Sequence, residues 1–137
     1  MAAVEAAIVA PFLVAMLLFV VLAGRVSEAD GNVRRAASEA ARAASLRQDA
    51  ADATEAASTT VDANLSAAGV DCESLTVDVD TSAFEPGGRV AVTVTCVASM
   101  HDVTFLGVPG TRVFDAHEVE VIDRYRADSA TAGEGET

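Results

Sequence analysis

The chain has 137 residues, and their composition already limits what they can form. It carries 9 basic residues, all of them arginine, and 21 acidic residues, for a formal net charge of -12. Hydrophobic residues make up 51% of the chain, but 29 residues are alanine and aromatic residues reach only 4%. Phosphate contacts need clustered basic side chains, so the composition argues against nucleic-acid binding. The scarcity of large apolar side chains limits the chain to one small core.

Residues 6–24 form a stretch of 19 residues without a charged side chain. A transmembrane helix needs about 20 apolar residues, whereas the apolar part of a cleaved signal peptide has about 7–15 and follows basic residues. No basic residue precedes this stretch, so we predict a retained transmembrane helix over residues 1–24, with a slight kink at Pro11. Residues 27–29 form a passable small-x-small cleavage site, which leaves open the alternative of a secreted, soluble remainder.

The charges after this stretch give conflicting signals about orientation. Five arginines lie between residues 25 and 47, and the positive-inside rule would place the C-terminal part in the cytoplasm. Three acidic residues in the same segment dilute them. Cys72 and Cys96 are an even number of cysteines in a small domain, which is typical of an oxidising exterior.

We predict a second, water-exposed helical segment over residues 26–68 that continues from the first. Its apolar positions recur at helical spacing and are mostly alanine. Such a narrow stripe buries little area, so it needs a partner to pack on. Residues 30–32 are a turn signal inside this pattern, through which we favour a continuous helix, and Gly69 is placed as a C-cap that ends it.

After residue 69 the period of the apolar positions changes from 3.6 to 2, which predicts three half-buried strands. The alternating segments are residues 75–80, residues 90–96, and residues 118–121 after the β-prone pair 113–114. Pro-Gly turn signals at residues 85–88 and 108–110 separate them. Short connections imply an antiparallel meander, whose apolar face we expect residues 46–68 to cover.

The predicted fold class is therefore α+β. A long N-terminal helix, with a membrane half and an Ala-rich amphipathic half, packs on a small antiparallel β-sheet in the shape of a lollipop. The predicted units are a transmembrane helix (1–24), an extracytoplasmic Ala-rich helix (25–69), a small β domain (70–126) and a disordered tail (127–137).

The residues that could carry chemistry form no recognisable catalytic or metal pattern. His101 and His117 lack a metal-ligand spacing, and we expect exposed or turn histidines. Residues 78–85 faintly resemble a calcium loop, but Ala83 stands where that loop needs glycine and Arg89 where it needs glutamate. We therefore expect no enzyme, no metal and no cofactor.

We predict a disulfide between Cys72 and Cys96. A hairpin about residues 85–88 would bring residue 72 near residues 98–101, and two thiols alone are too few ligands for a zinc site. The chain-entropy model gives such a bond roughly 3–4 kcal/mol. Two buried free cysteines are the alternative.

Glu5 lies one turn into the otherwise apolar N-terminal helix. A carboxylate at the bilayer centre costs about 2.5–3.5 kcal/mol on insertion scales, and less near an interface. Either Glu5 lies at the interface without a role, or it meets a positive partner in an assembly.

Residues 2–11 resemble the N-terminus of TadE-like pseudopilins of the Flp/Tad pilus systems. With Met1 at the first mature position, Glu5 falls at the fifth, as in that family, and aliphatic residues and a proline follow; Ala6 stands where the family often has an aromatic residue. Residues 33–45 are similar to the family's Ala/Arg-rich helix, and residues 116–126 look like its closing strand.

This resemblance implies a structural role, as a membrane-anchored pseudopilin that is an assembly factor or a minor subunit of a Tad-type pilus. The implied partners are other pilins and pseudopilins, the Tad assembly machinery, and a prepilin peptidase that cuts a basic leader ending in glycine. A basic leader would put positive charge on the cytoplasmic side and make the C-terminal domain extracytoplasmic. The alternative is a single-pass membrane protein whose β domain binds a ligand or partner.

Overall fold

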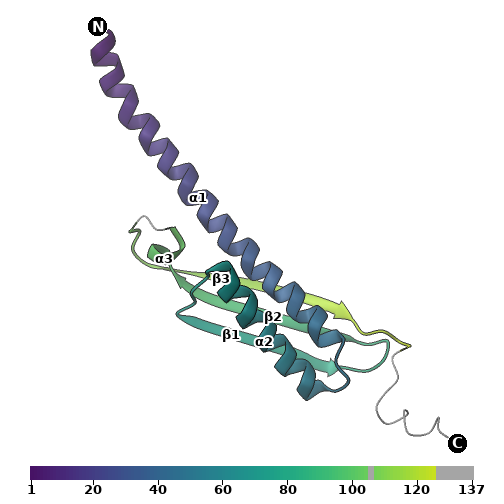
Figure 1. The fold of residues 1–137 in the computed structure, drawn as a ribbon. Helices are drawn as coiled ribbons and strands as arrows, with labels where there is room; N and C mark the ends of the chain where they lie inside the picture. The colour runs from purple at the N-terminus through teal and green to yellow at the C-terminus, as the bar shows by residue number, and fades with distance from the viewer. Residues whose placement is uncertain (105–106, 126–137) are drawn as a thin grey trace, which may run out of the picture.

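The computed structural model describes residues 1–104 and 107–125, and it has one long helix that emerges from a small head (Figure 1). The elements are α1 (Ala2–Ser45), α2 (Ala50–Ala68), β1 (Ser74–Ala83), β2 (Arg89–Ser99), α3 (Met100–Thr104) and β3 (Thr111–Val121). The first half of α1 projects from the head, and its second half belongs to the head (Figure 1). The predicted α+β architecture, with a long N-terminal helix on a small antiparallel sheet, is confirmed.

Helix α1 has 44 residues and is about 66 Å long at 1.5 Å per residue. It continues without interruption through residues 30–32, as predicted, although Gly31 has a low helix propensity. The Asp30 carboxylate and the Arg34 guanidinium form an ion pair of 3.0 Å across this point. An i,i+4 pair of this kind supports the helix where the glycine weakens it.

The prediction that this helix continues to residue 68 is wrong, because α1 ends at Ser45 and the chain turns back. The Ser45 hydroxyl donates a hydrogen bond of 2.7 Å to the Arg42 carbonyl oxygen. Asp49 adopts an extended conformation and accepts a hydrogen bond of 2.8 Å from the Asp52 amide, which caps the start of α2. The turn lets the alanine stripe of α2 pack on that of α1, and so each narrow stripe finds a partner.

Helix α2 ends where the sequence predicts. Gly69 has a left-handed φ of 72°, and its amide donates to the carbonyl oxygens of Leu65 and Ser66. This is a glycine C-cap that satisfies carbonyl groups at the helix end.

The three strands form the predicted antiparallel meander, in the order β1-β2-β3. The tight turn between β1 and β2 depends on Gly87 and Gly88. Gly87 has a φ of 81°, and the Gly88 amide donates to the Glu85 carbonyl oxygen at 2.8 Å. A Cβ atom at position 88 would collide with the backbone carbonyl oxygen of Ala83. The turn chemistry read from residues 85–88 is therefore a steric requirement.

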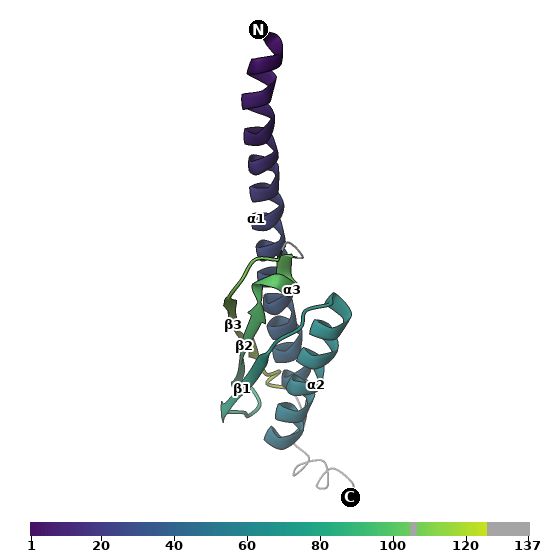
Figure 2. The same cartoon turned by 90° about the vertical axis from the view of Figure 1, so that its left-hand side faces the viewer.

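The second half of α1, rather than α2, covers the sheet. Helix α1 packs on β2 and β3, while α2 packs mainly on α1 and makes fewer contacts with β1 (Figure 2). The expectation that residues 46–68 cover the sheet is therefore wrong. The central strand supplies five buried residues, Val90, Val92, Val94, Cys96 and Ala98. Because α1 meets them mostly through alanine, the helix approaches the sheet closely.

Strand β3 faces the opposite way from the prediction over its last residues. Register places Phe114 and Ala116 on the helix-covered side, opposite Cys96 and Val94. Side chains alternate along a strand, so the valines at 119 and 121 lie on the outer face with exposed fractions of 49% and 71%. The large Phe114 ring gains more free energy from burial than either valine. Its burial therefore decides which side chains of β3 face the helix.

The short helix α3 was not predicted. The Thr104 hydroxyl donates a hydrogen bond of 2.6 Å to the Met100 carbonyl oxygen, and the Met100 amide donates to the Gly110 carbonyl oxygen at 3.0 Å. The first bond lies within α3, and the second joins α3 to the second predicted turn, where Gly110 has a φ of 98°. The predicted tail, residues 127–137, lies outside the described residues.

Candidate functional site

The first half of α1 is an apolar surface without a partner in the chain. The helix is long and apolar enough to cross a membrane, with a mean hydropathy of 2.9 in its best window and none of that window buried. Residues 6–24 span about 28 Å, close to the hydrocarbon thickness of about 30 Å. A cylinder of this length exposes roughly 900 Å² of apolar surface, more than the few hundred Å² that a water-facing protein exposes in one patch.

Glu5 lies in the first turn of α1 and its side chain is exposed. Its backbone amide donates to the Met1 carbonyl oxygen at 3.3 Å, which is the first hydrogen bond of the helix. Within residues 1–104 and 107–125, no cation lies within ion-pair distance of its carboxylate. The carboxylate is therefore available to a partner outside this chain.

Pro11 lies inside α1, six residues after Glu5. Proline lacks the amide that would donate to the carbonyl of residue 7, yet the helix continues through it. The slight kink predicted at Pro11 stays a prediction.

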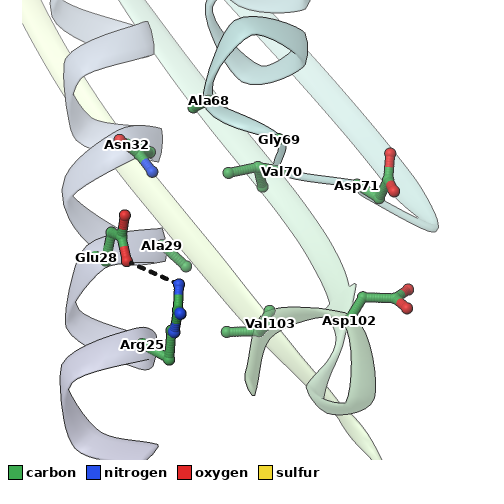
Figure 3. Close-up of a pocket in the computed structure, with 10 residues that line it drawn as sticks. All are labelled: Arg25, Glu28, Ala29, Asn32, Ala68, Gly69, Val70, Asp71, Asp102 and Val103. Carbon is green, nitrogen blue, oxygen red and sulfur yellow. Dashed lines mark ion pairs between the residues drawn. The ribbon is translucent and has the colours of Figure 1, made fainter. Parts of the chain in front are cut away.

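A cavity of about 180 Å³ lies where α1 leaves the head (Figure 3). Arg25 and Glu28 of α1 line one side and form an ion pair of 3.6 Å. Val70, just after α2, and Val103, in α3, point across the gap toward α1 (Figure 3). Arg25 is the first charged residue after the apolar stretch, so the cavity lies just beyond the predicted membrane span.

Sequence reasoning missed this cavity, because it is built by three segments that are far apart in the chain. The carboxylates of Asp71 and Asp102 belong to its lining but point away from α1 (Figure 3). The wall that faces α1 is therefore made by the apolar side chains of Ala68, Val70 and Val103, whereas α1 itself contributes the Arg25–Glu28 ion pair and Asn32.

Cys72 and Cys96 form a disulfide, with their Cα atoms 5.4 Å apart. Cys96 is fully buried in the central strand, opposite Leu75 of β1. The bond ties the segment that leaves α2 to the middle of the sheet.

The two histidines are exposed and lie apart from each other. His117 faces outward from β3 and forms a hydrogen bond of 2.8 Å with the Thr93 hydroxyl, and His101 lies 3.6 Å from the Asp102 carboxylate. Among the described residues there is no group of three or more side chains that could hold a metal ion. Asp80, from the calcium-like run, instead accepts a hydrogen bond of 3.0 Å from the amide of residue 82.

The chain thus combines a helix that is apolar and exposed in its first half with a small antiparallel sheet packed on its second half, a head carried by a helix long and apolar enough to cross a membrane. Residues 1–42 match the family model described as TadE-like protein. This match confirms the TadE-like resemblance over residues 1–42, while the likeness of residues 116–126 to the family's closing strand lies outside the match. No curated protein and no solved structure matches the chain.

Proposed function

We propose that this protein is a membrane-anchored pseudopilin that acts as an assembly factor or minor subunit of a Tad-type pilus. The observation that carries the proposal is the unpartnered apolar half of α1, with Glu5 in its first turn, in the segment that matches the TadE-like family. The family itself is associated with Tad pili and is generally non-enzymatic. The protein would have a structural role, without a cofactor.

The apolar half of α1 would serve two environments in turn. Before assembly it would cross the cell membrane once, because its length matches the hydrocarbon core. After assembly it would pack against the equivalent helices of neighbouring pilins and pseudopilins. Both environments exclude water, so one apolar surface satisfies both without refolding.

Glu5 would set the register between neighbouring helices. A carboxylate in a water-excluded helix bundle must be paired or protonated. The nearest cation at that depth would be the α-amine of a neighbour's first residue, created if a prepilin peptidase removes a leader. A buried pair of this kind contributes little net stability, but it favours one axial position over others.

The head would lie outside the cytoplasm. The Cys72–Cys96 disulfide supports this orientation, because structural disulfides form in oxidising compartments. The arginines that follow the apolar stretch oppose it by the positive-inside rule, and a basic leader ahead of Met1 would outweigh them.

Deleting the gene and counting surface pili tests the proposal. We expect the deletion strain to lose pili and the full-length gene to restore them. A version with residues 6–24 replaced by an unrelated transmembrane helix should still anchor the head but should not restore piliation. Normal piliation in the deletion strain would contradict the proposal.

A second candidate is favoured by the cavity beside Arg25. A single-pass membrane protein could use this cavity to bind an apolar group of a ligand or partner near the membrane surface. Under this alternative the unrelated transmembrane helix would preserve function, so the same exchange separates the two candidates.

A further inference from the structure

Charge is distributed unevenly over the head. All five arginines between residues 25 and 47 belong to α1 or to the turn after it, and residues 48–88 contain no basic residue. Helix α2 instead carries Asp52, Glu55 and Asp62 on its exposed side. Beyond the apolar stretch, α1 carries four arginines and three acidic residues, among which the exposed Glu39 lies three or four positions from Arg42 and Arg35. Every charged residue of α2 is acidic, so the two neighbouring helices differ in the charge that they present to solvent.

The basic surface is a stripe along α1 made by Gly31, Arg35, Ser38 and Arg42, which we call the α1 stripe. These residues are three or four positions apart, so they lie on one face of the helix, and all are exposed. They lie opposite the buried side of α1, which packs on the sheet and on α2. Within the described part of the chain, neither arginine forms an ion pair.

The acidic surface is a matching stripe along α2. It is made by Glu55, Thr59, Asp62 and Ser66, again three or four positions apart. All four are exposed and lie opposite the buried side of α2. We call this surface the α2 stripe. Neither of its carboxylates forms an ion pair within the described residues.

The charges of the two stripes are spaced alike along their helices. Helices α1 and α2 are joined by the short turn at residues 46–49 and run back along each other, so positions along both can be counted from that turn (Figure 2). Arg42 lies about 4.5 Å before the end of α1 and Glu55 about 7.5 Å after the start of α2. Arg35 and Asp62 lie about 15 Å and about 18 Å away, respectively. Both pairs thus have the same offset of about 3 Å, which long side chains span.

We propose that the α1 stripe of one copy docks on the α2 stripe of a second copy standing beside it in the same orientation. Arg35 would face Asp62 and Arg42 would face Glu55, with Ser38 beside Thr59 between them. This inference rests on the proposed function, because it uses the common membrane anchor to hold the copies parallel and level.

The contact is heterologous, because each copy uses a different face toward each neighbour. Two α1 stripes or two α2 stripes would oppose like charges, so the head-to-tail arrangement is the one that the charges favour. A heterologous contact repeats into a row that closes as a ring or stays open. Every anchor in such a row points in the same direction, as one membrane or one pilus requires.

Cysteine crosslinking in membranes of cells that express the full-length chain tests the contact. Both native cysteines are in the disulfide, so the added cysteines supply the free thiols. We expect the double variant Ser38→Cys/Thr59→Cys to give a ladder of dimers, trimers and longer products with a short bismaleimide. Each single variant alone should stay monomeric, and the two singles co-expressed should give dimers only.

Charge reversal in the double-cysteine background checks that the ion pairs direct the contact. We expect Arg42→Glu or Glu55→Arg to lower the ladder yield roughly tenfold, and the two together on one chain to restore it. Asp115→Arg, on the outer face of the sheet, is the matched control and should leave the ladder unchanged. An intact Cys72–Cys96 disulfide in each variant, measured by alkylation, shows that the head is folded.

Pilus counts in the same strains separate this inference from the proposed function. If pili require the protein but the double-cysteine variant gives no ladder, or if reversed charges leave the ladder unchanged, the stripe contact is wrong and the pseudopilin role stands. A dimer from Ser38→Cys alone would also overturn it, because that result needs two α1 stripes to meet. If pili form normally without the gene, the proposed function fails instead.

Discussion

Reducing the Cys72–Cys96 disulfide should destabilise the head by a large share of its total stability. The cysteines are 24 residues apart, and the chain-entropy model gives about 3.5 kcal/mol for closing a loop of that size. Small domains have a free energy of unfolding of only about 5–15 kcal/mol. Reduction should therefore lower the melting temperature of the head by about 15–25 °C.

The loss should fall first on β1. This strand lies at the edge of the sheet, and Leu75, Val77 and Val79 on its inner side are only partly buried, whereas the inner side of β2 is fully buried. Without the bond, β1 would keep its backbone hydrogen bonds to β2 but would lose the covalent link at Cys72, just before its first residue. Hydrogen exchange should therefore accelerate in β1 more than in β2 or β3.

Thermal unfolding of detergent-solubilised protein, with and without reductant, measures the effect. Reduction leaves both sulfur atoms in place and so isolates the crosslink, whereas the Cys72→Ala/Cys96→Ala variant adds the loss of packing at buried Cys96. The double variant should therefore melt below the reduced protein. A shift under about 5 °C on full reduction would refute the reasoning, because it would correspond to roughly 1 kcal/mol.

Three further predictions concern local structure in the head. Asp49→Ala should destabilise the protein by about 0.5–2 kcal/mol in chemical unfolding by removing the cap of α2, while Asp49→Asn should retain most of it. Gly88→Ala should cost more than Asp49→Ala, because its Cβ atom meets the carbonyl oxygen of Ala83; equal stability to wild type would contradict the turn geometry. Hydrogen bonds from the side chain and backbone of Ser82 hold the pKa of Asp80 below its usual range, so Asp80 stabilises the fold above about pH 4 and loses that contribution as the pH falls through its folded pKa. Asp80→Asn should weaken the pH dependence of the unfolding free energy below about pH 4. An unchanged pH dependence would count against this role.

The sequence predicted the elements whose signals are local. The helix over the apolar stretch before Arg25, the glycine cap at Gly69 and the valine alternation of β2 each depend on neighbours within a few residues, and the structure confirms all three. The Cys72–Cys96 pairing followed from one hairpin, which the turn at residues 85–88 fixes.

The features that the sequence did not predict depend on competition between distant segments. The break between α1 and α2 was not predicted, because the alanine-rich pattern runs on along the chain and the gain from packing α2 on α1 is invisible there. The direction of β3 was misread for the same reason. The alternation of Glu118 and Val119 does not show which of the two faces the helix. The packing of Phe114 under α1 decides it, and Val119 lies on the outer face.

The candidate site divides along the same line. Glu5 stands out in the sequence as one carboxylate in an apolar helix, whereas the cavity beside Arg25 needs Val70 and Val103 brought to α1 by the fold. The α1 and α2 stripes likewise became comparable only once the turn at residues 46–49 had set the heights of the two helices.

Piliation with Glu5→Gln tests the central claim most directly. The substituted amide would keep the shape of the side chain but lose its charge, so the variant removes the attraction to a neighbour's α-amine without creating a void. The account predicts that the variant reaches the membrane at wild-type level, keeps its Cys72–Cys96 disulfide, and yet fails to restore pili to the deletion strain. Wild-type numbers of pili with Glu5→Gln, in a strain whose piliation depends on the gene, would contradict the claim that Glu5 sets the register of assembly.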